Sequence, residues 1–170
     1  MASNKQLQMV MRDMLFITWR VEPELLRKVV DVKLELDTKT DSSGHELAFV
    51  SAVCFNVTEV RSGAIPFSSL SFQQVDYRAY VKAGDVSAVS FLDIRVNSRM
   101  VTTLTSFMSV PVRYEDIEIA TATGASGVLN YHVKSAGLRA EAVIDQNEVA
   151  ISDTVTSPRF ITQRPVGYAR

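Results

Sequence analysis

The chain has 170 residues, of which 18 are basic and 19 acidic, giving a formal net charge of −1 at pH 7. Like charges do not gather in long blocks, so neither nucleic acid nor an anionic membrane is expected as a partner. One domain over residues 1–170 is expected, because a chain of this length can bury about two-thirds of the surface that it exposes when unfolded.

The cysteine content and the N-terminal segment indicate the cellular compartment of the protein. The single cysteine, Cys54, lies in the apolar run AFVSAVCF and cannot form an internal disulfide. The segment MVMRDMLFITW is interrupted by Arg12 and Asp13, so it is too short and too polar for a signal-peptide core or a membrane span. These observations predict a cytoplasmic protein with no membrane segment.

The first part of the chain is rich in strand signals. Alternating or β-branched residues predict strands at 14–20, 34–38 and 46–60. In the segment EPELLRKVV, Pro23 suits the first turn of a short helix. Gly63 and Pro66 then predict a connecting loop.

Residues 72–83 alternate between polar and apolar side chains, which predicts a strand with one buried face. The polar set is Gln74, Asp76, Arg78, Tyr80 and Lys82. A second strand at 86–94 follows Gly84-Asp85, which predicts an antiparallel hairpin.

The second part of the chain predicts one more helix and a meander. Apolar residues three and four apart follow the cap candidates Asn97 and Ser98, and they predict a helix of about three turns that ends before Pro111. Three further strands are expected between residues 115 and 145, and the last stretch is expected to be a loop with one short helix. The fold class is therefore mainly β (α+β), with a curved antiparallel sheet or a β-barrel and two short helices.

Two environments for the polar set of 72–83 remain open: bulk water, or a cavity in which these groups form a site. If the hairpin closes through Gly84-Asp85 alone, Asp76 faces Asp93 and Arg78 faces Phe91, which brings two carboxylates near one guanidinium. A three-residue connection would shift the register by one and separate the acids.

The candidate residues follow from the cavity alternative. The ligand-binding candidates are Arg78, Gln74, Tyr80 and Asp93, and the catalytic candidates are Asp76 and Lys82. A lysine forms an imine when desolvation or a neighbouring cation lowers its pKa. Lys82 also fits a simpler interpretation, because it stands at a hairpin end where a lysine protects a sheet edge.

The sequence contains no motif for metal binding, nucleophilic catalysis or cofactor binding. His45 and His132 are isolated, so no metal site is expected, and Cys54 lies in an apolar strand where a thiol is inert. Neither a nucleophile elbow nor a glycine-rich phosphate loop is present, so no cofactor is expected.

Several segments, in order, resemble the bacterial domain-of-unknown-function 2071 family. The opening MRDMLFITWRVEPELLRKVVDVKLELDT is similar to the family's aromatic strand, P-E-L-L helix and L-E-L-D-T strand. FQQVDYRAYV resembles the family's F-x-E-x-N-x-R-x-Y-V strand, with Phe72, Arg78, Tyr80 and Val81 as matches. SFLDI, SVPVRYEDIEI and FITQRPVGYAR follow in the family's order.

That family is similar in fold to acetoacetate decarboxylase, so the resemblance implies a barrel-like core with a central cavity toward which the polar face of 72–83 points. Gln74 and Asp76 depart from the family's glutamate and asparagine, and the decarboxylase's tandem lysine motif is not present. The resemblance also implies that further C-terminal strands of the family are missing here.

Three functions follow as alternatives. The first is the binding of a small organic ligand, a carbonyl compound or a carboxylate, with Arg78 holding an anionic group. The second is a decarboxylase-type enzyme in which Lys82 forms a Schiff base beside Asp76. The third is a structural or interaction module that forms a homodimer through an uncovered sheet edge.

Overall fold

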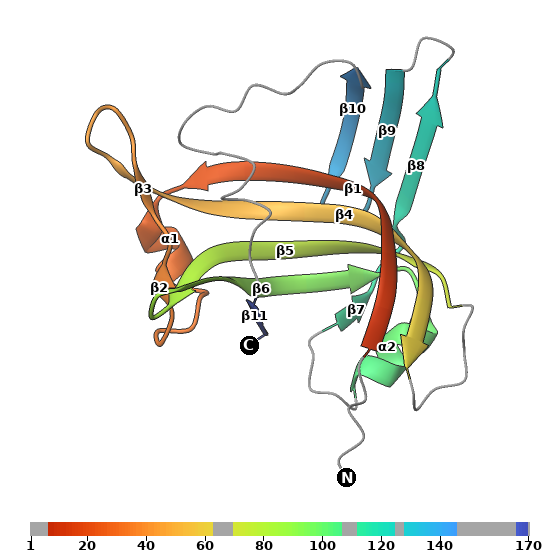
Figure 1. Ribbon diagram of the computed structural model, residues 1–170, viewed down its shortest axis with the longest axis horizontal. Coiled ribbons are helices and arrows are strands. Elements are labelled where there is room, and N and C mark those ends of the chain that lie inside the picture. Colours follow the sequence, from red (N-terminus) through yellow and green to blue (C-terminus); the bar gives the residue numbers. More distant parts are fainter. Residues whose placement is uncertain (1–6, 63–69, 107–111, 125–127, 146–165, 170) are drawn as a thin grey trace.

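The computed structural model describes residues 7–62, 70–106, 112–124, 128–145 and 166–169. These residues form two sheets and two short helices (Figure 1). The helices are α1 (Pro23–Arg27) and α2 (Arg99–Ser106). The strands are β1 (Leu7–Val21), β2 (Glu35–Leu36), β3 (Lys39–Thr40), β4 (Glu46–Ser62), β5 (Phe72–Ala83), β6 (Val86–Val96), β7 (Val112–Tyr114), β8 (Glu118–Thr123), β9 (Val128–Lys134), β10 (Arg139–Asp145) and β11 (Val166–Ala169).

The main sheet has eight strands, and its central order is β1-β4-β5-β6-β11. Neighbouring strands are antiparallel except where β7 and β11 pair parallel with β6. Within the described ranges β1 and β11 stand at opposite ends of this order, so the sheet is curved but not closed. The curved-sheet alternative is therefore confirmed, and the barrel alternative is not.

The C-terminal segment corrects one expectation. Residues 166–169 form strand β11, where the sequence predicts a loop with a short helix. The strand pairs with β6 at Ala88–Phe91, a contact between segments that are distant in the sequence. Residues 146–165 lie outside the described residues.

The main sheet bends where β1 and β4 turn a corner (Figure 1). The register between these strands shifts between Val10 and Met11 and again between Arg12 and Leu15. Asp13, inside the second shift, has a φ of 53°, the left-handed region that few non-glycine residues adopt. Its Oδ2 accepts a hydrogen bond from Asn56 Nδ2 at 2.9 Å. Such bulges bend a strand locally, which accounts for the corner.

The conformation of Asp13 leads to a stability prediction. We expect Asp13→Val to be less stable than Asp13→Gly by about 1–2 kcal/mol, because a β-branched residue is strained in the left-handed region and glycine is not. Both variants lose the hydrogen bond to Asn56, so the difference between their free energies of unfolding reports the backbone strain at residue 13. Urea unfolding of the two proteins measures it, and equal midpoints would contradict the prediction.

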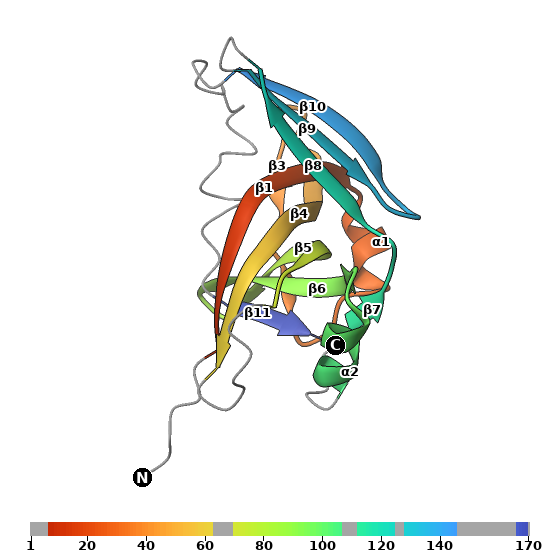
Figure 2. The same cartoon turned by 90° about the vertical axis from the view of Figure 1, so that its right-hand side faces the viewer.

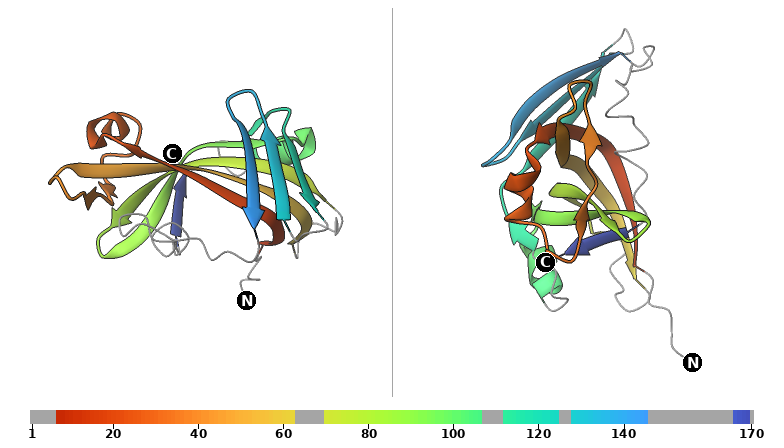
Figure 3. Two further views of the ribbon diagram at one scale, coloured as in Figure 1. Left: turned by 90° about the horizontal axis from the view of Figure 1, so that it is seen from above. Right: turned by 90° about the vertical axis from the view of Figure 1, so that its left-hand side faces the viewer.

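The two faces of the main sheet have different surroundings. We call the face that carries Val75, Ala79 and Val81 the outer face and the face that carries Asp76 and Arg78 the inner face. The outer face is covered by α1 and by the second sheet, which lie on the same side of the main sheet (Figures 2 and 3). The second sheet has three strands in the order β10-β9-β8, which confirms the predicted meander.

Polar side chains fasten the second sheet to the main one. Gln73 donates from Nε2 to the carbonyl of Ile119 at 2.8 Å and to Asn56 Oδ1 at 3.0 Å. Asn97 accepts the Gln73 backbone N–H on its Oδ1 at 2.7 Å. Because Asn97 is used in this way, Ser98 caps α2, its Oγ accepting the Val101 N–H at 3.4 Å.

Helix α2, described over Arg99–Ser106, is more exposed than the sequence predicts. Of its apolar residues, Val101 is buried, while Met100 and Leu104 are exposed. Val101 packs with residues of the inner face, including Val53 and Phe55. Phe107 and Met108, also expected on this helix, lie outside the described residues. Among the described helices, none has the length and apolar content needed to cross a membrane.

Candidate functional site

The polar side chains of β5 lie on the inner face of the main sheet, between two apolar clusters. One cluster gathers Val53, Phe55 and Val96 around α2, and the other gathers Phe49, Tyr80 and Val89. Between them stand Gln74, Asp76 and Arg78, which share one face because successive strand residues alternate. The structure thus brings four predicted site residues together: Gln74, Asp76, Arg78 and Tyr80.

Arg78 is held between two aromatic rings. Its guanidinium carbon lies 4.9 Å from the centre of the Phe16 ring on β1 and 5.7 Å from the centre of the Tyr80 ring. Cation–π contacts of this kind restrict the plane of the guanidinium group. The arrangement suits a planar anion such as a carboxylate.

A chain of hydroxyl groups runs beside Arg78 across three strands. Tyr80, which is fully buried, shares a hydrogen bond of 2.6 Å with Ser51 Oγ on β4. Ser51 in turn shares a hydrogen bond of 2.7 Å with Thr18 Oγ1 on β1. Ser51 lies directly opposite Arg78 in the β4–β5 pairing. These hydroxyls fix the Tyr80 ring and, through it, one wall of the Arg78 position.

Asp76 is a buried carboxyl group, with 7% of its surface exposed. Its cross-strand neighbours are Val53 on β4 and Ile94 on β6, both apolar. Its Oδ1 accepts a hydrogen bond from Gln74 Nε2 at 2.7 Å. Burial raises the pKa of Asp76 from 3.8 to about 6, and the Gln74 hydrogen bond and the Arg78 charge oppose part of that rise.

Asp93 is not part of this site, which corrects the sequence prediction. The hairpin does close through Gly84-Asp85, and Arg78 does face Phe91. A bulge in β6 then shifts the register, so that Asp93 faces Tyr77 and Asp76 faces Ile94. The bulge turns Asp93 to the outer face, and the expected pair of carboxylates does not form.

Asp93 instead belongs to an ion-pair network on the outer face. Its Oδ2 lies 2.8 Å from Arg95 Nε, and its Oδ1 lies 3.7 Å from Arg113 Nε. Arg95 Nη1 also donates to Glu115 Oε2 at 2.6 Å, and Glu115 Oε1 accepts the Ala136 N–H at 2.7 Å. The network therefore ties β6 to the turn between β9 and β10.

Lys82 occupies the end of β5, where its side chain is 42% exposed. Its Nζ lies 3.6 Å from Oδ1 of the buried Asp37. Imine-forming lysines are desolvated or lie beside another cation, whereas Lys82 is partly exposed and lies beside a carboxylate. Lys82 pairs with Glu35 on β2 and with Ser87 on β6, so the interpretation that it protects a sheet edge is wrong.

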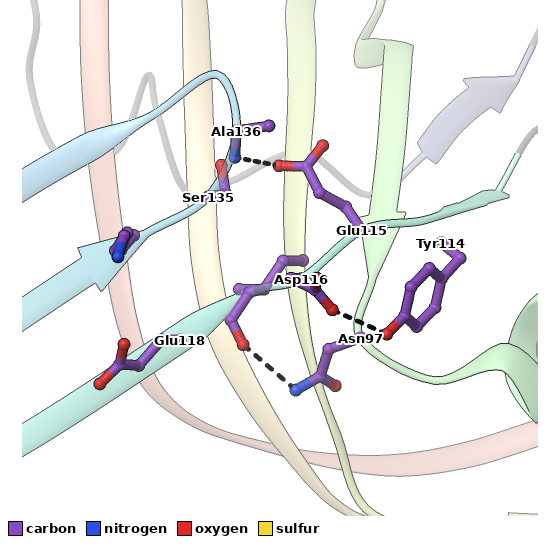
Figure 4. A pocket seen from close by; sticks show the side chains of 9 residues that line it. Asn97, Tyr114, Glu115, Asp116, Glu118, Ser135 and Ala136 are labelled. Atoms are coloured by element: carbon purple, nitrogen blue, oxygen red, sulfur yellow. Dashed lines mark hydrogen bonds between the residues drawn. The ribbon is translucent and has the colours of Figure 1, made fainter.

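A pocket of about 700 Å³ lies on the outer face, where the second sheet meets the main one (Figure 4). It is lined by Asn97, Tyr114, Glu115, Asp116, Ile117, Glu118, Lys134, Ser135 and Ala136. Several of its polar groups bind one another: Tyr114 donates to Asp116 at 2.7 Å, and Asn97 donates to the Ile117 carbonyl at 3.3 Å. These bonds occupy part of the polar lining of the pocket.

Other reactive side chains lie apart from the inner-face site. Burial raises the pKa of the Cys54 thiol to about 12, so it stays protonated at neutral pH. His132 Nδ1 lies 3.5 Å from Glu141 Oε1 across the β9–β10 pair. Among the described residues, no three histidine, cysteine or acidic side chains gather closely enough to hold a metal ion.

Sequence reasoning missed three residues of the site. Phe16 and Thr18 come from β1 and Ser51 from β4, both distant in sequence from β5. The available signal was weak: Ser51 is a lone hydroxyl in the apolar run AFVSAVCF, and Thr18 interrupts MLFITWR. A hydroxyl at such a position needs a hydrogen-bond partner when buried, which points to a polar neighbour across the sheet.

Comparison with known proteins places the chain among uncharacterized relatives. The family model DUF2071, described as an uncharacterized conserved protein, matches residues 8–170. Among curated proteins, none matches the sequence.

Solved structures share the fold at low sequence identity. An acetoacetate decarboxylase is 16% identical with a TM-score of 0.56, the match covering 82% of this chain and 50% of that one. The acetoacetate decarboxylase of Legionella pneumophila is 9% identical with a TM-score of 0.56, covering 85% and 52%. The enduracididine biosynthesis enzyme MppR, also solved with pyruvate, is 14% identical with a TM-score of 0.56, covering 91% and 59%. The chain spans about half the length of these structures.

Proposed function

Since the chain belongs to the DUF2071 family of uncharacterized conserved proteins and has the fold of acetoacetate decarboxylase-like proteins, we propose that it binds a small carboxylate on its inner face. The observation that carries this proposal is the position of Arg78 between the rings of Phe16 and Tyr80. Arg78 supplies the paired N–H donors, and Gln74 and the hydroxyl chain supply further polar groups.

The surroundings of Arg78 strengthen its attraction for an anion. The half-buried guanidinium is flanked by aromatic surface and by the apolar clusters on either side. Charged hydrogen bonds are stronger where water is partly excluded. A ligand of a few carbon atoms, with a carboxylate at one end and an apolar or carbonyl-bearing end, matches this mixture of groups.

Pyruvate is a suitable probe, because it is a small 2-oxo carboxylate and because MppR, which shares the fold, has been solved with it. Binding is measured by ligand-detected NMR and by calorimetric titration. We expect Arg78→Ala to weaken pyruvate binding about 10- to 100-fold, the usual cost of losing charge-assisted hydrogen bonds. Arg78→Lys should retain part of the affinity, because it keeps the charge but not the paired geometry.

The matched control is Arg139→Ala on β10, an exposed arginine of the second sheet. It changes the net charge equally and should leave pyruvate affinity unchanged. Acetone, which lacks the carboxylate, should bind wild type and Arg78→Ala with equal affinity. The proposal fails if pyruvate does not bind, or if it binds Arg78→Ala as tightly as the wild-type protein.

A further inference from the structure

The pocket at the junction of the two sheets carries charged side chains that are available to a ligand (Figure 4). We propose that this pocket is a second binding site, on the outer face, and that it takes a free amino acid with a basic side chain. The inference does not rest on the proposed function, because none of the residues that line the pocket belongs to the inner-face site.

Hydrogen bonds hold the walls of this pocket in place. Glu115 accepts Arg95 Nη1 on Oε2 at 2.6 Å and the Ala136 N–H on Oε1 at 2.7 Å, so both of its oxygens are engaged. On the other side, Asn97 Nδ2 donates to the Ile117 carbonyl at 3.3 Å. A pocket of about 700 Å³ with walls fixed in this way has the size and the rigidity of a pre-formed site for a small molecule.

Three charged side chains of the lining are not used by the fold in the same way. Asp116 accepts the Tyr114 hydroxyl on Oδ1 at 2.7 Å, and a carboxylate has room for further donors. Glu118 and Lys134 stand directly opposite each other in the β8–β9 pairing. Within the ranges that the structure describes, neither of these two forms an ion pair or a side-chain hydrogen bond. The pocket therefore offers a ligand two carboxylates and one ammonium group.

A basic amino acid carries the complementary set of charges. Lysine, for example, has two ammonium groups and one carboxylate. The Cα atoms of Asp116 and Glu118 lie at most about 7 Å apart, because two residues separate them, and Lys134 lies about 5 Å across the strand pair from Glu118. One lysine molecule can therefore place an ammonium group at each carboxylate and its own carboxylate at Lys134. Each contact is a charge-assisted hydrogen bond.

The uncharged part of the lining fits the rest of such a ligand. The Tyr114 ring is 39% exposed and is held by Arg99, whose guanidinium carbon lies 4.4 Å from the ring centre. This ring and the Ala136 methyl group provide apolar surface for a chain of methylene groups. Ser135 Oγ, also in the lining, is buried without a hydrogen-bond partner among the described residues. A buried hydroxyl of this kind is uncommon, and it leaves the wall able to form one more hydrogen bond.

Calorimetric titration of the full chain with L-lysine at low salt tests the inference. We expect binding, and we expect two ligands that each lack one charged group to bind more weakly by at least about 3-fold, since charged hydrogen bonds at exposed groups contribute modestly. L-Norleucine lacks the side-chain ammonium group. Cadaverine lacks the carboxylate.

Substitutions of the three charged residues assign each contact. Asp116→Asn and Glu118→Gln should each weaken L-lysine binding about 3- to 10-fold. Lys134→Gln should weaken the binding of L-lysine but not of cadaverine, which has no carboxylate for Lys134 to hold. The matched control is Glu24→Gln on α1, which removes an exposed carboxylate outside the pocket and should leave the affinity for L-lysine unchanged. Urea unfolding verifies that each variant is folded.

Several results would overturn this inference. They are the absence of L-lysine binding, equal affinity for L-lysine and L-norleucine, and an equal loss of affinity in Glu24→Gln and Glu118→Gln, which would indicate non-specific attraction between charges. Excess pyruvate should not displace L-lysine, and displacement would place both ligands in one site and also overturn it. Absence of pyruvate binding, in contrast, would refute only the proposed function.

Discussion

Asp76→Asn is expected to raise the free energy of unfolding by about 2–3 kcal/mol at pH 8 and to leave it nearly unchanged at pH 4. Burial raises the pKa of Asp76 from 3.8 to about 6, and one pKa unit corresponds to about 1.4 kcal/mol. The ionised carboxylate is thus less stable in the folded protein than in the unfolded chain. Asparagine keeps the hydrogen bond from Gln74 and carries no charge.

The sign follows from proton binding. Between about pH 4 and pH 6 the folded protein holds the Asp76 proton while the unfolded chain releases it, so this residue lowers stability as the pH rises. Below this window Asp76 is protonated in both the folded and the unfolded state. Above it, Asp76 is ionised in both states and lowers the free energy of unfolding by its full amount. Urea unfolding at pH 4, 6 and 8 measures the effect.

The matched control is Asp85→Asn in the exposed turn between β5 and β6, which should change stability by less than about 0.5 kcal/mol at every pH. A destabilised Asp76→Asn at pH 8 would contradict the prediction. The expected gain has a functional meaning, because residues that destabilise the fold are retained where a site needs them.

Phe49→Ala is expected to lower the free energy of unfolding by about 3–5 kcal/mol, the usual loss for a phenylalanine removed from a core. Phe49 has no exposed surface and packs with Tyr80 and Val89 on the inner face. Its removal leaves a cavity beside the Tyr80 ring, which forms one wall of the Arg78 position. Pyruvate affinity should therefore fall as well, even under conditions in which the variant is folded.

Val32→Ala serves as the control. Because Val32 is 88% exposed, this substitution should lower the free energy of unfolding by less than about 0.5 kcal/mol. Thermal and urea unfolding compare the two variants. A loss below about 1 kcal/mol for Phe49→Ala would show that the inner face repacks and that the cluster does not brace Tyr80.

Much of the fold could be predicted because its signals are local. Alternation along β5, the glycine-containing turn before β6 and the meander of β8, β9 and β10 all depend on neighbouring residues. The pairing of β11 with β6 could not be predicted, since it joins residues 88–91 with residues 166–169. Nor could the open sheet be distinguished from a barrel, because closure depends on which edge strands meet.

The site was predicted in part for the same reason. Gln74, Asp76, Arg78 and Tyr80 share a face by strand periodicity alone. Asp93 was misplaced because one bulged residue in β6 exchanges the faces beyond it, and no glycine or proline marks that bulge. Ser51 and Thr18 were missed because their place beside Tyr80 depends on the registers of β1, β4 and β5, which the sequence does not specify.

The parallel pairing of β11 with β6 has a consequence for biosynthesis. Translation proceeds from the N-terminus, so residues 88–91 emerge from the ribosome well before residues 166–169 can join them. During that interval the backbone groups along one side of β6 are open to other nascent chains, a known route to aggregation. Chaperone demand and solubility in cells should therefore be sensitive to the last residues of β11 even when the rest of the chain is intact.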